Sequence, residues 1–178
     1  IQEDKNITIF GDYDVDGGTS VALLVNYFKR IGARADFYIP DRIKEGYGPN
    51  PAAFGKLKAN GTDLVITVDC GTSSFDSMKK AKEIGLEVII IDHHLSAENH
   101  PEVAALINPN RRDEVSEYKY LCAAGVSFLL LVALQRKLRQ EGYFAEISEP
   151  NLLEFLDLVA LGTISVSYTH LRAHETEE

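Results

Sequence analysis

The stretch "ITIFGDYDVDGGTS", residues 7–20, joins a short apolar run to an acidic turn. Its first four residues are β-branched or aromatic, which favours a β-strand. The turn then sets Asp12, Asp14 and Asp16 at every second position and follows them with two glycines. Three carboxylates directly after a strand indicate a loop that binds a cation.

The spacing matches the first half of an EF-hand calcium loop. That loop has acidic residues at positions 1, 3 and 5, a glycine at 6 and a bidentate glutamate at 12. Counting from Asp12, position 12 is Leu23, which offers no oxygen ligand. The preceding run is also typical of a strand and not of the entering helix that an EF-hand needs. We therefore reject an EF-hand.

Apolar runs alternate with helical patterns along the first part of the chain. Strands are expected at residues 7–10, 35–39, 64–68 and 88–91. Helices are expected from Val21 to near Gly32, at 51–60 and at 73–85. This alternation predicts an α/β fold with a parallel sheet flanked by helices, and strands this apolar are covered on both faces. In such sheets, ligands bind at the carboxyl ends of the strands.

Beyond residue 105 the pattern becomes helical, with helices expected at about 121–141 and 151–161. Apolar residues recur at helical spacing in both segments, and we interpret them as core. In the first segment they are Val126, Leu129, Leu130, Ala133, Leu134 and Leu138. In the second they are Leu152, Phe155, Leu156, Val159 and Ala160.

Length and composition favour one globular domain, with 178 residues, 45% hydrophobic and 25% charged. The sequence contains no run of 18 apolar residues that could span a membrane. We interpret Cys70 and Cys122 as two buried thiols, which predicts a cytoplasmic protein. A formal net charge of −9 argues against a general polyanion-binding surface. Any phosphate substrate must therefore be met locally, by a metal or by a few basic residues.

Two further strand ends carry unusual residues. Asp69 follows one strand in "TVDCGTSS", and Asp92, His93 and His94 follow the next in "IIIDHH". A single acid after a strand often caps the next helix, so Asp69 alone leaves cap and ligand equally open. An Asp-His-His on the same sheet edge as four other carboxylates favours metal ligation.

The charge of this cluster predicts cations. Carboxylates packed within about 6 Å raise one another's pKa unless a cation intervenes. Oxygen ligands mixed with imidazole suit Mn²⁺, Mg²⁺, Fe²⁺ or Zn²⁺ better than calcium. Five acids and two imidazoles exceed the needs of one ion, so we predict a pair roughly 3.5–4 Å apart that shares a carboxylate, as in phosphate-ester cleavage. Gly17, Gly18 and Gly71 would let a phosphate approach backbone amides.

These motifs resemble those of a known family. "DYDVDG" (12–17), "VDCGTSS" (68–74) and "DHH" (92–94) are similar, in order and spacing, to the first three motifs of the DHH phosphoesterases. Within that family, the RecJ group of single-strand DNA exonucleases is the most similar, over residues 7–164. That narrower likeness rests on "RIKEGYGP" (42–49), "ITVDCGTSS" (66–74), "INPN" (107–110), "AAGVSFLL" (123–130) and "LLEFLDLVALGTI" (152–164).

The resemblance implies a nuclease core with two divalent ions, Mn²⁺ or Mg²⁺, that degrades single-stranded DNA from the 5′ end in recombination and repair. It implies these metal ligands: Asp14, Asp16, Asp69 as the bridge, and His93, with Asp12 as an additional candidate. His94 resembles the residue that faces the scissile phosphate, and Asp92 resembles the partner that orients an imidazole. Candidates for contact with the DNA strand are Arg42, Tyr47, Arg111 and Arg112, for which solvated surface stays an equal alternative. We expect a monomer.

The sequence departs from the family after residue 164. Relatives continue "ALGT(I/V)" with Ala-Asp, and that Asp is a metal ligand of a fourth motif, whereas Ser165 and Val166 stand here. Residues 165–178 show neither helical nor strand periodicity, so we interpret residues 1–164 as a truncated catalytic core and the rest as a foreign or disordered tail. The family's C-terminal substrate-binding domain and oligonucleotide-binding barrel are also missing from the sequence. We therefore expect a poor nuclease.

Two alternatives stay open. One is another DHH phosphoesterase, acting on short oligoribonucleotides, cyclic dinucleotides or pyrophosphate. The other is a noncatalytic DHH relative that serves as a scaffold in a replication complex. "GYG" and "INPN" count against the first, and the intact acids and histidines of the three motifs count against the second.

Overall fold

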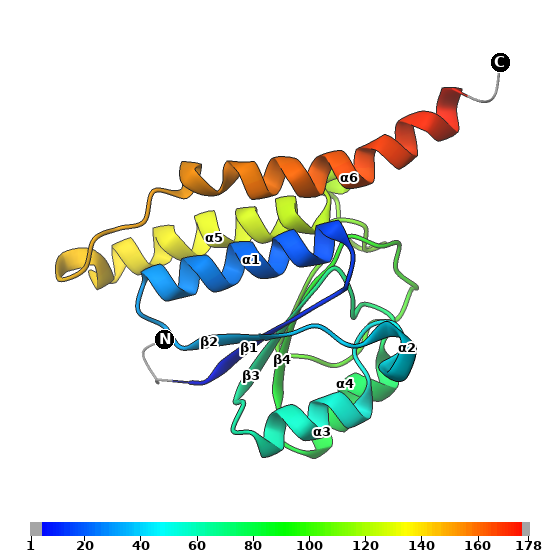
Figure 1. The fold of residues 1–178 in the computed structure, drawn as a ribbon, viewed down its shortest axis with the longest axis horizontal. Helices are drawn as coiled ribbons and strands as arrows, with labels where there is room; N and C mark the ends of the chain where they lie inside the picture. Colours follow the sequence, from blue (N-terminus) through cyan, green and yellow to red (C-terminus); the bar gives the residue numbers. More distant parts are fainter. Residues whose placement is uncertain (1–4, 176–178) are drawn as a thin grey trace.

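A computed structural model describes residues 5–175, and the side chains of residues 5–166. Its centre is a five-stranded parallel sheet in the order β2-β1-β3-β4-β5 (Figure 1). The strands are β1 (Ile7–Gly11), β2 (Ala35–Tyr38), β3 (Leu64–Val68), β4 (Glu87–Ile91) and β5 (Ala105–Ile107). The four expected strands are confirmed to within one residue at each end. β5 was not expected, because three residues before Asn108 and Pro109 are too few to show a strand pattern.

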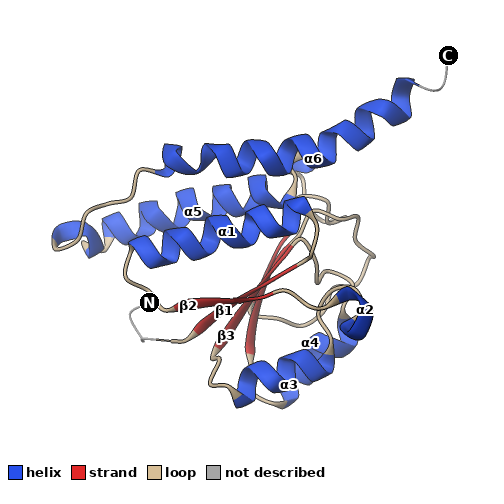
Figure 2. Ribbon diagram, viewed as in Figure 1, coloured by secondary structure: helices blue, strands red, loops and turns tan. Residues whose placement is uncertain are grey.

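Helices cover both faces of the sheet (Figure 2). On one face lie α1 (Val15–Arg30) and α5 (Ala123–Gln140), and α6 (Leu156–Glu175) packs on these two helices, away from the sheet. On the other lie α3 (Pro51–Ala59) and α4 (Phe75–Glu83), with the short α2 (Arg42–Glu45) near the carboxyl ends of the strands. Three 3-10 turns complete the chain: η1 (Tyr118–Tyr120), η2 (Tyr143–Ala145) and η3 (Leu152–Phe155). The α/β fold with a helical C-terminal part is confirmed.

Alternate residues of the central strands enter two separate cores. Ile9 and Ile66 pack with α1 and α5 residues on one face of the sheet. Phe10 and Val65 pack with α3 and α4 residues on the other. This explains why the central strands are apolar at nearly every position. The expectation of two covered faces is wrong for the edge strand β2, where the Phe37 side chain is 62% exposed.

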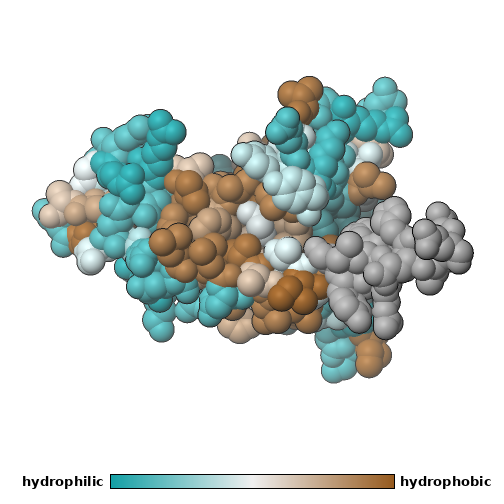
Figure 3. All heavy atoms as spheres, turned by 90° about the horizontal axis from the view of Figure 1, so that it is seen from above, coloured by the Kyte–Doolittle hydropathy of each residue, from teal (hydrophilic) through white to brown (hydrophobic). Residues whose placement is uncertain are grey.

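The apolar stripes of the C-terminal helices are only partly core. Val126 and Leu138 of α5 are buried, whereas Leu129 is exposed and Leu131, off the expected stripe, is fully buried. In the next segment Phe155 is buried, but Leu156 at the start of α6 is exposed. Ala133 and Ala160 of the expected stripes are exposed as well. Figure 3 looks onto this helical layer and shows apolar residues along its middle.

The end of the chain differs from expectation. α6 continues as a helix to Glu175, although regular structure was expected to stop near residue 164. The side chains beyond Val166 and all of residues 176–178 lie outside the described residues, so the expected tail at 165–178 stays a prediction as regards its packing and origin. Within the described part, no helix has the length and apolarity of a membrane span. Cys70 and Cys122 are both buried and unpaired, as expected.

Candidate metal centre

Strand register brings the acidic motifs to one place. Gly11, the last residue of β1, is paired with Val68 of β3, and Val68 is paired with Ile91 of β4. The next residue of each strand is an aspartate: Asp12, Asp69 and Asp92. Because the three strands are neighbours and parallel, these carboxylates follow each other across one edge of the sheet. β1 is also where the strand order reverses, which is the usual ligand position in such sheets.

Two groups of side chains at this edge could each hold a metal ion. One consists of Asp12, Asp14 and Asp69, and the other of Asp69, His93 and His94. In each group, the candidate ligand atoms lie within 4.8 Å of one another. Asp69 belongs to both groups, which is the arrangement expected of a carboxylate shared by two ions.

The Asp69 carboxylate is buried, and its backbone has a positive φ. It is 2% exposed, and its φ of 61° is the only positive value among the described non-glycine residues. Burial raises the pKa of Asp69 to about 7, and nearby Asp16 and Asp14 add to the rise, whereas His93 opposes it. A buried carboxylate in strained backbone is costly, and such strain concentrates at functional sites.

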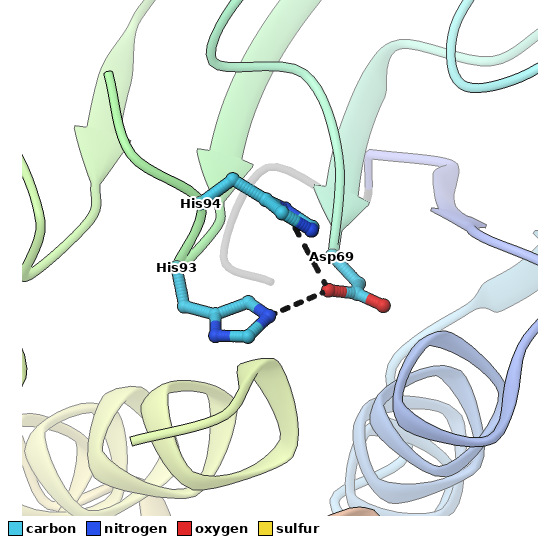
Figure 4. A group of neighbouring side chains, drawn as sticks. All are labelled: Asp69, His93 and His94. Atoms are coloured by element: carbon cyan, nitrogen blue, oxygen red, sulfur yellow. Dashed lines mark ion pairs between the residues drawn. The ribbon is translucent and has the colours of Figure 1, made fainter. Parts of the chain in front are cut away.

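The histidine rings converge on the same oxygen of Asp69 (Figure 4). His93 Nε2 lies 3.2 Å from Asp69 Oδ1, and His94 Nδ1 lies 4.0 Å from it. Although burial alone would lower the pKa of His93, the Asp69 carboxylate holds it above its ordinary value. The expected bridge and the expected histidine ligand are therefore in contact.

Asp92 orients the second histidine. Its Oδ1 lies 2.7 Å from His94 Nδ1 and also accepts the backbone N–H groups of His93 and His94. This bond raises the pKa of His94 to about 9. Although burial opposes it, the bonds from His94 and Thr72 hold the pKa of Asp92 at about 2. The geometry agrees with the orienting role expected of Asp92, and it leaves His94 Nε2 for a substrate.

Asp16 differs from the other acids. Its two oxygens accept the backbone N–H groups of Ala123 and Ala124 at 2.7 and 2.9 Å, so it caps α5 from a neighbouring helix. Its Oδ2 still lies 3.5 Å from His93 Nε2. Asp16 belongs to neither ligand group among the described residues. A metal-ligand role for Asp16 stays a prediction, and its observed partners are backbone amides.

The donor set fits divalent cations. Asp12 Oδ1 and Asp69 Oδ1 are buried and have no hydrogen-bond partner in the described part of the chain, since the His93 approach to Asp69 lacks hydrogen-bond geometry. Buried carboxylate oxygens are normally paired, so these two need a cation or a proton. Burial also raises the pKa of Asp12. Carboxylate oxygens with an imidazole nitrogen suit Mn²⁺ and, with fewer nitrogen ligands, Mg²⁺.

The amides of Gly17 and Gly18 were expected to meet a phosphate, but they form hydrogen bonds within the acidic turn. The Gly17 amide donates to Asp14 Oδ1 at 2.9 Å, and the Gly18 amide donates to the Asp14 carbonyl. These two amides are therefore not free for a phosphate. A Cβ at Gly17 would lie 2.6 Å from the Asp12 carbonyl oxygen, so close packing of the turn requires the glycine. The amide of Gly71 remains a candidate.

The structure separates the four candidates for DNA contact. The Arg42 guanidinium stacks over the Tyr13 ring at 4.4 Å, beside the acidic turn. Tyr47 is 59% exposed, and its hydroxyl donates to the Asp69 carbonyl at 3.4 Å. Arg111 instead forms an ion pair with Asp113 and donates to a backbone carbonyl, and Arg112 is exposed. Arg42 and Tyr47 are thus near the centre, whereas Arg111 is engaged elsewhere.

Sequence reasoning missed several residues of the centre. Thr72, Asn108 and Asn110 form hydrogen bonds to Asp92 or to the histidine backbone. Asn108 and Asn110 belong to the quoted "INPN", which was used only as a likeness. Both asparagines follow β5, which lies next to β4 in the sheet. Because β5 was not expected, the sequence pattern did not place them beside the histidines.

Comparison with known proteins agrees with this geometry. The protein-family model described as "DHH family, N-terminal domain" matches residues 6–163 of this chain. A single-stranded-DNA-specific exonuclease RecJ of Dickeya dadantii is 42% identical over 168 residues, which are 93% of this chain and 29% of that protein. The one of Salmonella typhimurium is 43% identical over 167 residues, 92% of this chain and again 29% of that protein. This chain therefore spans less than a third of these two relatives.

A solved structure is similar as well. The crystal structure of exonuclease RecJ bound to manganese matches with a TM-score of 0.77 and 35% sequence identity. The match covers 92% of this chain and 39% of the other.

Proposed function

Since the chain belongs to the DHH family, we propose that it forms the catalytic core of a metal-dependent phosphodiester hydrolase, an exonuclease that degrades single-stranded DNA from the 5′ end in recombination and repair. Two relatives named as single-stranded-DNA-specific exonucleases support the substrate. The observation that carries the proposal is the shared carboxylate of Asp69, which stands between two ligand groups with an unpaired buried oxygen.

The centre would hold two divalent ions, Mn²⁺ or Mg²⁺, with Asp69 as the bridge. Asp12 and Asp14 would serve one ion and His93 the other, with Asp16 beside His93. A solved relative described as bound to manganese supports the metal. When bound, such ions stabilise negative charge on phosphoryl oxygens and activate water for in-line displacement.

His94 would act on the substrate. Because its Nδ1 is bonded to Asp92 and its side chain is half exposed, Nε2 is the ring nitrogen that would meet a substrate. The carboxylate of Asp92 fixes the ring and, in the metal-free protein, raises its pKa to about 9, which favours the protonated imidazole. A charged donor in this position would bind a phosphoryl oxygen of the scissile bond.

A few residues around the centre would hold the DNA strand. Arg42 presents a guanidinium to solvent beside the acidic turn, and Tyr47 presents an aromatic ring above Asp69. Phosphate pairing and base stacking are the usual means of binding single strands. Arg112 stays a candidate, and Arg111 is the weakest because its guanidinium is paired with Asp113. We propose further that the protein is a cytoplasmic monomer.

Position 166 offers the test. Gly162 of α6 packs against Asp16, since a Cβ there would lie 3.0 Å from Asp16 Oδ1. Val166 is one helical turn further on the same face and is half buried. An acid at this position, which the family likeness leads us to expect, would reach the rim of the centre. This supports the interpretation of residues 1–164 as a core that lacks its fourth-motif ligand.

The experiment compares three proteins: the chain itself, the Ser165→Ala/Val166→Asp variant, and that variant with His94→Ala. Release of nucleotides from 5′-labelled single-stranded DNA is measured with Mn²⁺. We expect little release by the chain, more by the variant, by about 10 to 100-fold, and none above background after His94→Ala. Activity only on di-ribonucleotides, cyclic dinucleotides or pyrophosphate would replace the DNA assignment, and inactivity on all substrates would favour the scaffold.

A further inference from the structure

The backbone of the two histidines is held from both sides. Their N–H groups donate to Asp92 Oδ1 at 2.8 and 3.2 Å. On the other side, the His93 carbonyl accepts from Asn110 Nδ2 at 2.6 Å, and the His94 carbonyl accepts from Asn108 Nδ2 at 2.9 Å. The two peptide units that carry the rings therefore have little freedom to move.

Asn108 also joins three strand ends. It is 3% exposed, and its Nδ2 donates to Thr72 Oγ1 at 3.1 Å. The Thr72 amide in turn donates to Asp92 Oδ2 at 3.0 Å. Thr72 follows β3, Asp92 follows β4 and Asn108 follows β5. One buried amide thus fixes the loops after three strands relative to each other.

The two asparagines act together and do not present themselves as ligands. Asn108 Oδ1 accepts the backbone N–H of Asn110 at 2.8 Å, so its oxygen is already used. Asn110 Nδ2 also donates to the Lys119 carbonyl at 3.1 Å, which ties η1 to the same loop. Pro109 between them restricts the backbone. Their amide donors are used by three carbonyl groups and the Thr72 hydroxyl.

We propose that Asn108 and Asn110 are positioning residues that set the metal affinity of the centre by holding the carbonyl groups of His94 and His93. The proposal rests on the proposed function. Both rings must face Asp69 for the second ligand group to exist, and ring direction follows from the backbone that carries it. Outer partners that orient ligands typically change metal affinity by about 10 to 100-fold when removed.

The test uses the 178-residue chain and its Asn110→Ala and Asn108→Ala variants. Asn110 is half buried, so its truncation leaves a smaller defect than that of the buried Asn108 and keeps the test usable if Asn108→Ala does not fold. The matched control is Asn6→Ala. Asn6 Nδ2 also donates to a backbone carbonyl, that of Gly61 at 3.1 Å, but at the opposite end of the sheet.

Two quantities are measured: the Mn²⁺ dissociation constant by calorimetry, and the unfolding temperature in EDTA. We expect Asn110→Ala to bind Mn²⁺ about 10-fold more weakly, while Asn6→Ala keeps the wild-type affinity, and the unfolding temperatures in EDTA should show that both variants are folded. Wild-type Mn²⁺ affinity in Asn110→Ala, or an equal loss in Asn6→Ala, would overturn the inference alone. Absence of Mn²⁺ binding by the wild type would overturn the proposed function and the inference together.

Discussion

Replacing Asp69 by asparagine should stabilise the metal-free protein and abolish its response to Mn²⁺. Burial raises the pKa of Asp69 from 3.8 to about 7, which corresponds to about 4 kcal/mol against the ionised form. This shift already includes the opposing effect of His93, and asparagine also leaves protonated His93 without its carboxylate partner, so we expect a net gain of about 1–3 kcal/mol at pH 8. Asparagine is nearly isosteric and tolerates the φ of 61° as aspartate does.

The sign of the pH dependence follows from the direction of this shift. A carboxyl with a raised pKa binds a proton more tightly in the folded state, so stability falls as pH rises from about 4 to about 7. His93 acts in the same direction, because its raised pKa contributes stability below about pH 6.5 that is lost as pH rises further. Relative to the wild type, Asp69→Asn should therefore be more stable at pH 8 than at pH 5.

Mn²⁺ should make the wild type more stable than Asp69→Asn, which reverses their order of stability without metal. At a free Mn²⁺ concentration of about 1,000 times the dissociation constant, a single site stabilises the wild type by about 4.1 kcal/mol, which exceeds the gain of about 1–3 kcal/mol expected for the variant. Asp69→Asn loses the shared ligand and should gain almost nothing. The assay is urea unfolding followed by circular dichroism at pH 5 and pH 8, in EDTA and in Mn²⁺. A variant that is less stable than the wild type in EDTA at pH 8, or that gains equally from Mn²⁺, would refute the reasoning.

Three further predictions follow from single contacts. Gly17→Ala should destabilise the chain by about 1–3 kcal/mol, because its Cβ would press on backbone, whereas Gly18→Ala has open space in α1 and should stabilise it by about 0.5–1 kcal/mol in thermal unfolding. Asp92→Asn should lower the pKa of His94 from about 9 toward about 6.5, read by NMR titration without metal, and an unchanged value would exclude Asp92 as its cause. Arg42→Ala should weaken binding of labelled single-stranded DNA and reduce the salt slope by about 1 in anisotropy measurements, whereas an unchanged slope would exclude a phosphate contact.

The fold could be predicted where the apolar pattern extends over several residues. The prediction failed where a strand is short. β1, β3 and β4 are recognisable because each is buried at most positions, and the acids at their ends mark the carboxyl edge, whereas β2 keeps an apolar pattern although none of its residues is buried. β5 has only three residues and gives no such pattern. On α5, the outward Leu129 and the buried Leu131 are chemically alike, so helical spacing alone could not tell which side faces α1 and the sheet.

α6 shows the same limit of helical periodicity over a longer segment. Residues 165–175 carry no amphipathic stripe, yet they continue α6, because a helix that is already formed extends at little cost. Periodicity predicts which residues a helix buries, and a segment without a buried stripe can still be helical when it follows one that packs. Gly162, at which α6 packs against Asp16, lies just before this segment.

Five aspartates of the centre look equivalent in the sequence, and the structure divides four of them into two kinds. The fifth, Asp14, caps α1 by accepting the Gly17 amide and also belongs to a ligand group. Asp16 and Asp92 accept several N–H groups from other segments, so they hold α5 and the histidine loop in place. Asp12 and Asp69 keep unpaired buried oxygens. Removal of the first kind should cost stability, because buried donors lose their partners. Removal of Asp69, and by the same reasoning of Asp12, should relieve charge and cost only the metal, so unfolding measurements without metal can separate the acids that build the centre from those that bind its ions.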